Sequence, residues 1–382
     1  MSPTVVQVAS PVVSLTSGFR SYIINNFNEN KMLYCYLIKL TMSCKITTLL
    51  LTLVINTSVV NAQLPNIFDT TILKPRYRVI IDNDFGGDPD GLFQLTHMLL
   101  SPSVEVRAII GSHLSSKDGF DPSASQADNA AKEATQLLKV MKLEGGVPII
   151  AGSNAGMIND STPVKSEAVK FIIEEALRTD TDLPLFIVCG AGLTEIASAV
   201  LTQPLIEKKI TLVWIGGPEY VDLAYPPPGY SSPEYNLNID IHAARVIFNK
   251  SDINFWQVPR NAYRQCIASY AQLLTNVKTK GETGKYLVSK LEKVTTMLHH
   301  YHLNIGETYI LGDSPLVLLT ALQSTFEADP SSSKYVIKQA PFINENGDYK
   351  FNTTGRNIRV YNELDTHLMF DDFFAKLALF NK

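Results

Sequence analysis

The chain has 382 residues and a formal net charge of −4, with 45% hydrophobic and 18% charged residues. A disordered chain would need fewer apolar residues and more net charge, so that class is excluded. Without a basic excess, we expect no nucleic acid partner. Four cysteines in a chain of this length exclude a disulfide scaffold. No apolar run reaches the roughly 18 residues of an ordinary transmembrane helix, so we expect no stable membrane span.

The N-terminal region contains the pattern of a secretory signal peptide. Lys45 precedes an apolar stretch that is too short and too hydroxylated to span a bilayer, and Ala62 supplies a small residue for cleavage. We therefore expect a start at Met42, cleavage after Ala62 and a secreted product. A buried helix or an uncleaved anchor is the alternative. The predicted parts are an upstream extension at residues 1–41, a signal peptide at 42–62 and one folded domain at 63–382.

Two cysteines remain in the predicted secreted domain, Cys189 and Cys266. They could form one disulfide, or remain as two buried thiols, since Cys189 ends an apolar, strand-like run. Glycosylation sequons at Asn159, Asn249 and Asn352 are consistent with a secreted chain.

Strand and helix patterns alternate from residue 78 onward. Residues 78–82 form a short apolar strand that runs into acidic residues, and Asp88 followed by Pro89 favours a helix start with Asp88 as the N-cap. Further strands are expected over 104–110, 147–151, 183–189 and 210–215, and helices over 92–100, 124–142, 165–178 and 193–202. This alternation predicts a single-domain α/β fold with a mostly parallel, open sheet flanked by helices.

An acidic segment follows the first predicted strand. Residues 82–90 read Asp-Asn-Asp-Phe-Gly-Gly-Asp-Pro-Asp and hold four carboxylates in nine residues. Open α/β sheets bind ligands at this strand end. Carboxylates this close repel one another unless a cation screens them, and Ca²⁺ and Mg²⁺ prefer such oxygen ligands. The segment predicts a cation site, with a capped helix and solvated carboxylates as the simpler alternative.

Two other functions share parts of this pattern. Phosphoryl transfer uses an Asp-x-Asp at a strand end as nucleophile and Mg²⁺ ligand, but no convincing downstream lysine and second acidic pair accompany it here. A dinucleotide-binding fold would open the first helix with Gly-x-Gly-x-x-Gly, which this sequence lacks.

The acidic segment resembles the Asp-rich signature of the nucleoside hydrolases. Further segments are similar to motifs of that family and occur in the family's order. These segments are Val147–Gly152, Val188–Ala197, Trp214–Gly217, Glu234–Ala244 and Asp313–Ala321. Their joint occurrence is more specific for the family than any one segment alone. The resemblance implies a Rossmann-like core and Ca²⁺-dependent hydrolysis of the N-glycosidic bond of ribonucleosides to free base and ribose.

The resemblance also assigns roles around the cation. It implies that Asp84 is a Ca²⁺ ligand and the general base for the metal-bound water. Asp313, the backbone carbonyl of Cys189 and one of Asp88 and Asp90 complete the ligand set, with Asp88 and Asp90 both open as the bidentate ligand. The chemistry agrees, because a metal lowers the pKa of its bound water and a nearby carboxylate can take the proton.

The resemblance places further residues at the substrate. It implies that Glu234 and Asn236 hold ribose hydroxyls. Asp82 would lie next to the site and orient the cluster. Asp88 would face the ribose if Asp90 is the bidentate ligand. Ser112 lies where the family often has a pocket asparagine. The implied partners are a small nucleoside and, by resemblance alone, further copies in a homodimer or homotetramer.

The sequence departs from the family on the side of the leaving base. Gly312 stands where many members have a histidine that assists the base, so activation would come from Tyr225, Tyr230 or His113, or be absent. The loop before Glu234 also lacks the usual ribose-binding asparagine. Two alternatives therefore stay open, a non-catalytic member that binds a nucleoside or sugar and an enzyme for another glycoside.

Overall fold

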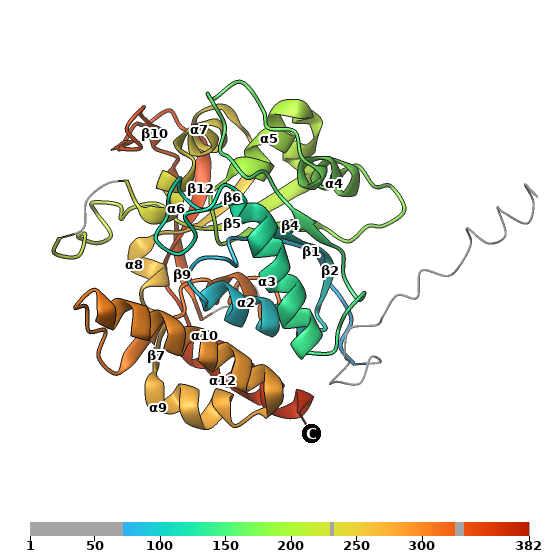
Figure 1. Cartoon of the computed structure of the whole chain (residues 1–382). Helices are drawn as coiled ribbons and strands as arrows, with labels where there is room; N and C mark the ends of the chain where they lie inside the picture. Colours follow the sequence, from blue (N-terminus) through green and yellow to red (C-terminus); the bar gives the residue numbers. More distant parts are fainter. Residues whose placement is uncertain (1–71, 230–232, 325–331, 382) are drawn as a thin grey trace, which may run out of the picture. The chain divides into compact units, whose positions relative to one another are not determined.

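An eight-stranded sheet organises the part of the chain that the computed structural model describes, residues 72–229, 233–324 and 332–381 (Figure 1). The predicted upstream extension, signal peptide and cleavage site lie outside these residues. The strand order is β3-β2-β1-β4-β5-β6-β12-β9, and only the β12–β9 pair is antiparallel. The strands are β1 (Tyr77–Asn83), β2 (Val104–Gly111), β3 (Ile149–Ala151), β4 (Leu185–Cys189), β5 (Ile210–Ile215), β6 (Asn254–Val258), β9 (Lys334–Gln339) and β12 (Asn357–Glu363). The predicted mostly parallel, open α/β sheet is confirmed.

Helices cover both faces of the sheet. One face carries α4 (Glu167–Ala176), α5 (Thr194–Thr202) and α7 (Ile241–Arg245). The other carries α2 (Asp90–Leu99), α3 (Gln126–Val140), α10 (Gly281–His300) and α12 (Thr366–Phe380) (Figure 1). The remaining elements are α6 (Tyr235–Ile239), α8 (Arg260–Tyr263), α9 (Tyr270–Gln272), α11 (Pro315–Leu318), η1 (Pro204–Lys209), η2 (Val246–Lys250), η3 (Leu273–Lys278), β7 (Ile267–Ser269), β8 (Thr308–Ile310), β10 (Phe342–Ile343) and β11 (Tyr349–Lys350).

The core divides into two clusters according to the alternation of side chains along each strand. In β1, Val79 and Ile81 pack into the cluster under α2 and α3, and Ile80 packs into the cluster under α4 and α5. Both faces of the strand are therefore buried, which explains its continuous apolar run. The same alternation sends Asp82 to the α5 face and Asn83 to the α2 face.

The first helix begins slightly later than the sequence pattern predicts. Pro89 is the residue that precedes α2, and Asp90 is its first helical residue. Oδ1 of Asp88 still accepts a hydrogen bond from the backbone N–H of Asp90, at 3.3 Å. Asp88 thus lies one residue before the N-cap and still accepts a hydrogen bond from the first turn of the helix. This bond uses only Oδ1 of the carboxylate.

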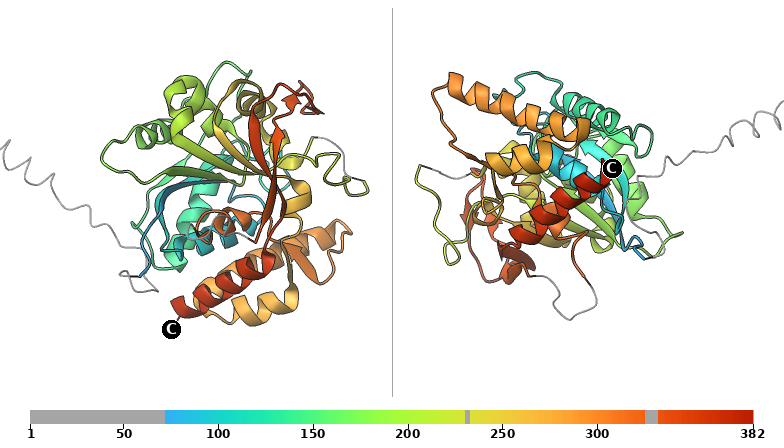
Figure 2. Two further views of the ribbon diagram at one scale, coloured as in Figure 1. Left: turned by 180° about the vertical axis from the view of Figure 1, so that it is seen from behind. Right: turned by 90° about the horizontal axis from the view of Figure 1, so that it is seen from below.

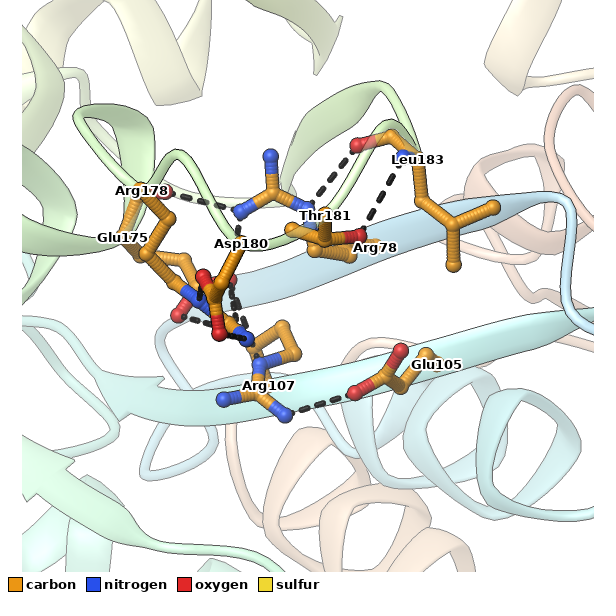
Figure 3. A network of polar contacts seen from close by, with 8 residues as sticks. All are labelled: Arg78, Glu105, Arg107, Glu175, Arg178, Asp180, Thr181 and Leu183. Atoms are coloured by element: carbon orange, nitrogen blue, oxygen red, sulfur yellow. Dashed lines mark hydrogen bonds and ion pairs between the residues drawn. The ribbon is translucent and has the colours of Figure 1, made fainter.

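A buried ion-pair network ties α4 to the beginnings of β1 and β2 (Figure 3). Oε1 of Glu175 lies 2.6 Å from Arg78, 3.2 Å from Arg107 and 3.0 Å from Arg178. The Arg78 guanidinium also donates to the backbone carbonyls of Glu175 and Leu183. Arg78 and Glu175 are both buried, so this network replaces their lost hydration. It lies at the opposite end of β1 from the acidic segment.

The C-terminal helix α12 packs against α2 and η3 (Figure 2). The contact with α2 includes polar groups, because Nε2 of the buried His97 lies 2.7 Å from Asp372, and Lys376 also pairs with Asp372. Within the described ranges, no helix is long and apolar enough to cross a membrane. Cys189 and Cys266 are buried free thiols, which decides between the two alternatives that the sequence left open.

Candidate active site

A cavity of about 250 Å³ opens at the carboxyl ends of the central strands. Strand β1 lies between β2 and β4, the point where the strand order reverses and where open sheets bind ligands. The residues that line the cavity therefore come from loops that are distant in sequence. The lining residues are Asp84, Asp88, Asp90, Phe120, Gly190, Ile215, Glu234, Tyr235, Asn236, Tyr263, Arg264, Ile310, Gly312 and Asp313.

Four aspartates of this lining are held in an environment that disfavours their charge. Burial and the nearby carboxylates of Asp313 and Asp88 raise the pKa of Asp84 well above its usual range. Burial and the neighbouring carboxylates also raise the pKa of Asp90 well above its usual range. Burial raises the pKa of Asp88 to about 6 and that of Asp313 to about 7. The cluster is therefore unfavourable as four bare anions and calls for a positive charge.

The chemistry of this donor set fits a hard divalent cation. Carboxylate oxygens are the ligands that Ca²⁺ and Mg²⁺ prefer, and a bound cation would restore the ionised form of these aspartates. Among the described residues, no group of three His, Cys, Asp or Glu side chains is already arranged to hold a metal ion. The fit therefore rests on the identity and shared lining of Asp84, Asp88, Asp90 and Asp313, and on the burial of Asp84 and Asp313.

Neutral side chains fix the orientation of the aspartates. The Asn83 amide donates to Oδ2 of Asp313 at 2.9 Å, and its carbonyl accepts from the backbone N–H of Asp84 at 2.8 Å. The Tyr309 phenol donates to Oδ1 of Asp88 at 2.9 Å. Asp90 accepts from the backbone N–H of Asp313 at 3.2 Å. These bonds join the first strand end to the segment before α11.

Glu234 and Asn236 line the same cavity. Oε2 of Glu234 accepts from the backbone N–H groups of Gly217 and Leu237, at 2.7 and 3.2 Å, and Oε1 accepts from the Tyr263 phenol at 2.8 Å. The Asn236 amide donates to the carbonyls of Gly190 and Ile215. Glu234 thus caps α6 and closes the loop after β5, and its carboxylate is fixed in place before any ligand arrives.

The other predicted residues do not line the cavity. Ser112 donates a short hydrogen bond to Oδ1 of Asp82, and its hydroxyl lies 3.5 Å from Glu195. Asp82 and Ser112 thus lie behind the site, toward α5. Cys189 is buried directly before Gly190, which does line the cavity. The residue roles taken from the resemblance stay predictions.

The candidates for assisting the leaving base are placed elsewhere. Nε2 of His113 lies 3.0 Å from the hydroxyl of Thr194, which in turn donates to Asp240. Tyr225 is 90% exposed and does not line the cavity, and Tyr230 lies outside the described residues.

The structure adds lining and supporting residues that the sequence did not single out. These are Asn83, Phe120, Tyr235, Tyr263, Arg264 and Tyr309. Asn83 lies inside the acidic segment and could have been predicted, because side chains alternate along a strand and Asn83 therefore points to the opposite face from Asp82. No local pattern marks the others. A Cβ atom on Gly312 would lie 3.3 Å from both the Tyr263 ring and Oδ2 of Asp90. The Tyr263 ring therefore lies next to the position at which many family members have a histidine.

These features define an α/β enzyme with an acidic site at its switch point, and the comparisons assign its family. The family model described as inosine-uridine preferring nucleoside hydrolase matches residues 79–371. The chain belongs to this family and is a hydrolase of N-glycosyl bonds.

Solved structures share the fold at low identity. A plant nucleoside hydrolase is 19% identical with a TM-score of 0.61, covering 80% of this chain and 99% of that one. A purine-preferring ribonucleoside hydrolase from Gardnerella vaginalis is also 19% identical, with a TM-score of 0.60 and the same coverage. The type III effector XopQ, solved in complex with adenosine diphosphate ribose, is 15% identical with a TM-score of 0.50, covering 81% of this chain and 94% of the effector. A search of curated protein sequences finds no match.

Proposed function

We propose that the protein is a secreted, Ca²⁺-dependent nucleosidase that releases free base and ribose from ribonucleosides. The observation that carries the proposal is the shared cavity of Asp84, Asp88, Asp90 and Asp313 at the switch point of the sheet. Glu234 and Asn236 in the same lining suit a hydroxyl-rich sugar, which a plain apolar pocket would not select. Family membership supports the reaction class.

Asp84, Asp313 and the backbone carbonyl of Cys189 would hold the cation, together with Asp88 or Asp90. When bound, Ca²⁺ would screen the carboxylates, lower the pKa of a coordinated water and orient vicinal hydroxyls. Asn83 and Tyr309 keep two of the aspartates oriented through bonds of 2.9 Å each. Such supporting contacts generally tune a metal site as much as the ligands do.

The residues divide the reaction between them. Asp84, whose pKa is raised by burial, takes the proton from the attacking water and is the catalytic base. Glu234 and Asn236 hold the ribose, and the anionic lining stabilises the positive charge that develops on the sugar in an oxocarbenium-like transition state. Phe120, Tyr235 and Tyr263 supply aromatic surface on which a base can stack.

A second candidate is a member that binds a nucleoside or sugar without turnover. Gly312 favours it, because the lining offers no histidine at that position to assist the leaving base. The XopQ effector, whose structure contains adenosine diphosphate ribose, has a similar fold. The intact acidic cluster argues for catalysis, since uncompensated buried carboxylates cost stability unless a cation is bound.

The deciding experiment measures free base. The chain would be expressed for secretion and incubated with inosine, uridine, adenosine and guanosine, with Ca²⁺ or with a chelator, and the products separated by chromatography. We expect Ca²⁺-dependent base release that is lost in Asp84→Asn and kept in Asp121→Asn. Asp121 is a matched control, because it accepts bonds from Ser123 and Asn129 in the loop after β2. Binding of Ca²⁺ and nucleoside without any release would favour the second candidate.

A further inference from the structure

The lining of the cavity is strongly anionic. Among its described residues, the carboxylates of Asp84, Asp88, Asp90, Asp313 and Glu234 face one guanidinium, that of Arg264. Asp118 adds a carboxylate near the rim, where it accepts a hydrogen bond of 2.7 Å from the lining residue Tyr235. A divalent cation would leave the described lining with an excess of negative charge. Such a field attracts a positively charged ligand.

The same lining offers few groups that could protonate a leaving base. Its four aspartates are the proposed cation ligands, and the Glu234 carboxylate already accepts three hydrogen bonds. The described lining residues include no histidine, lysine or cysteine. The phenols of Tyr235 and Tyr263 donate to Asp118 and Glu234, at 2.7 and 2.8 Å. The Asn236 amide donates to two backbone carbonyls. His113 is bonded to Thr194 outside the lining. A neutral base departs with an electron pair that needs a proton, and general acid catalysis of this step is worth about 10²–10⁴-fold.

From these two observations we propose that the site acts preferentially on ribonucleosides whose base carries a fixed positive charge, such as pyridinium ribosides. This inference rests on the proposed nucleosidase function. In such a substrate the bond between C1′ and the cationic ring nitrogen breaks, and both electrons return to the nitrogen. The base leaves as a neutral pyridine and needs no proton. The water oxygen bonds to C1′, and the water's proton passes to the Asp84 carboxylate and then to solvent.

Three ribosides separate the two parts of the inference. Inosine is neutral and needs a proton on its leaving group. p-Nitrophenyl β-ribofuranoside is neutral and needs none. Nicotinamide riboside is cationic and needs none. With the secreted protein and Ca²⁺, we expect kcat for the last two to exceed that for inosine by about 100-fold, the contribution of a missing general acid. We also expect nicotinamide riboside to have the lowest KM, with a KM that rises as salt is added.

A matched pair of variants tests the charge directly. Asp118→Asn removes a negative charge near the cavity rim, whereas Asp121→Asn removes one from the same loop where the carboxylate faces Ser123 and Asn129. We expect Asp118→Asn to raise the KM for nicotinamide riboside severalfold without a matching rise for p-nitrophenyl riboside. Asp121→Asn should change neither KM.

Each outcome bears on one hypothesis. Inosine turnover that equals or exceeds that of nicotinamide riboside would overturn the preference and leave the nucleosidase function intact. Turnover of p-nitrophenyl riboside without nicotinamide riboside would also overturn it. A failure to cleave any of the three, with Ca²⁺ bound, would overturn the nucleosidase function itself.

Discussion

The side-chain amide of Asn83 donates a hydrogen bond to Oδ2 of Asp313 at 2.9 Å, across 230 positions of sequence. The same Asn83 side chain accepts the backbone N–H of Asp84 at 2.8 Å. One neutral residue thus sets the positions of two proposed cation ligands. It also satisfies one oxygen of Asp313 without adding charge to a cluster that already holds several buried carboxylates.

Removing this amide should weaken the proposed cation site. We expect Asn83→Ala to lower the affinity for Ca²⁺ by about 10-fold or more, as is typical when a residue that orients a metal ligand is lost. Calorimetric titration of the chelator-treated protein measures the change. The control is Asn129→Ala, which removes an amide that bonds to Asp121 and Ser123 on the protein surface. Equal affinities in Asn83→Ala and the unmodified protein would contradict the assignment.

Close approach of backbone and side chains at Gly190 should make that position intolerant of a methyl group. A Cβ there would lie 2.7 Å from Cγ of Asp313 and 2.6 Å from Nδ2 of Asn83. We expect Gly190→Ala to lower kcat/KM by about 100-fold, since displacements near 1 Å cost that much in a site. Gly119→Ala is the control, because no atom lies within 4 Å of its added carbon. Kinetics with the preferred riboside decide the matter, and similar rates for both variants would contradict the prediction.

The contact between α2 and α12 should make stability depend on pH. Burial lowers the pKa of His97 to about 4, from 6.5 in an exposed histidine. Between these values the unfolded chain binds the proton and the folded chain does not, so stability falls as pH falls from 6.5 toward 4. This group alone should cost about 2 kcal/mol at pH 5.

Urea unfolding at pH 7 and pH 5 measures this cost. The loss of stability between the two pH values should be smaller in His97→Gln than in the unmodified protein. His367→Gln, which changes a side chain that is 88% exposed, should retain the full loss. An identical pH dependence in all three proteins would show that His97 does not carry it.

The ion-pair network at the other end of β1 should be sensitive to the loss of Glu175. Glu175→Gln would leave the buried Arg78 guanidinium without a counter-charge, and we expect the free energy of unfolding to fall by about 3 kcal/mol. Glu174→Gln changes the exposed neighbour on the same helix and should stay within about 0.5 kcal/mol. Thermal and denaturant unfolding test this, and comparable effects of the two substitutions would contradict the role of the network.

The sheet could be predicted because its strands are buried on both faces. Ile80 and Ile81 point to opposite sides of β1, and both are fully buried. The strand is therefore apolar throughout, and the pattern is visible locally. The acidic segment was also visible, because Asp84, Asp88 and Asp90 are close in sequence. Asp313 was found only through its resemblance to a family motif.

The remaining part of the site depends on tertiary contacts that no local pattern encodes. Tyr263 and Tyr309 contact Glu234 and Asp88 because α8 and β8 end at the cavity, and neither tyrosine stands in a recognisable motif. The resemblance implied that Asp82 lies beside the sugar, and that role stays a prediction. The alternation along β1 turns its side chain toward Ser112.

The distance in sequence between Asp84 and Asp313 bears on how the protein is made. Their cavity requires β1 and the segment before α11 together. At the usual rate of synthesis, the second residue leaves the ribosome roughly 10 to 50 s after the first. During that interval the nascent chain carries an acidic cluster that is incomplete and open to solvent. The protein therefore becomes competent to bind its cation only after the segment that contains Asp313 has been synthesised, so shorter nascent chains would be inactive.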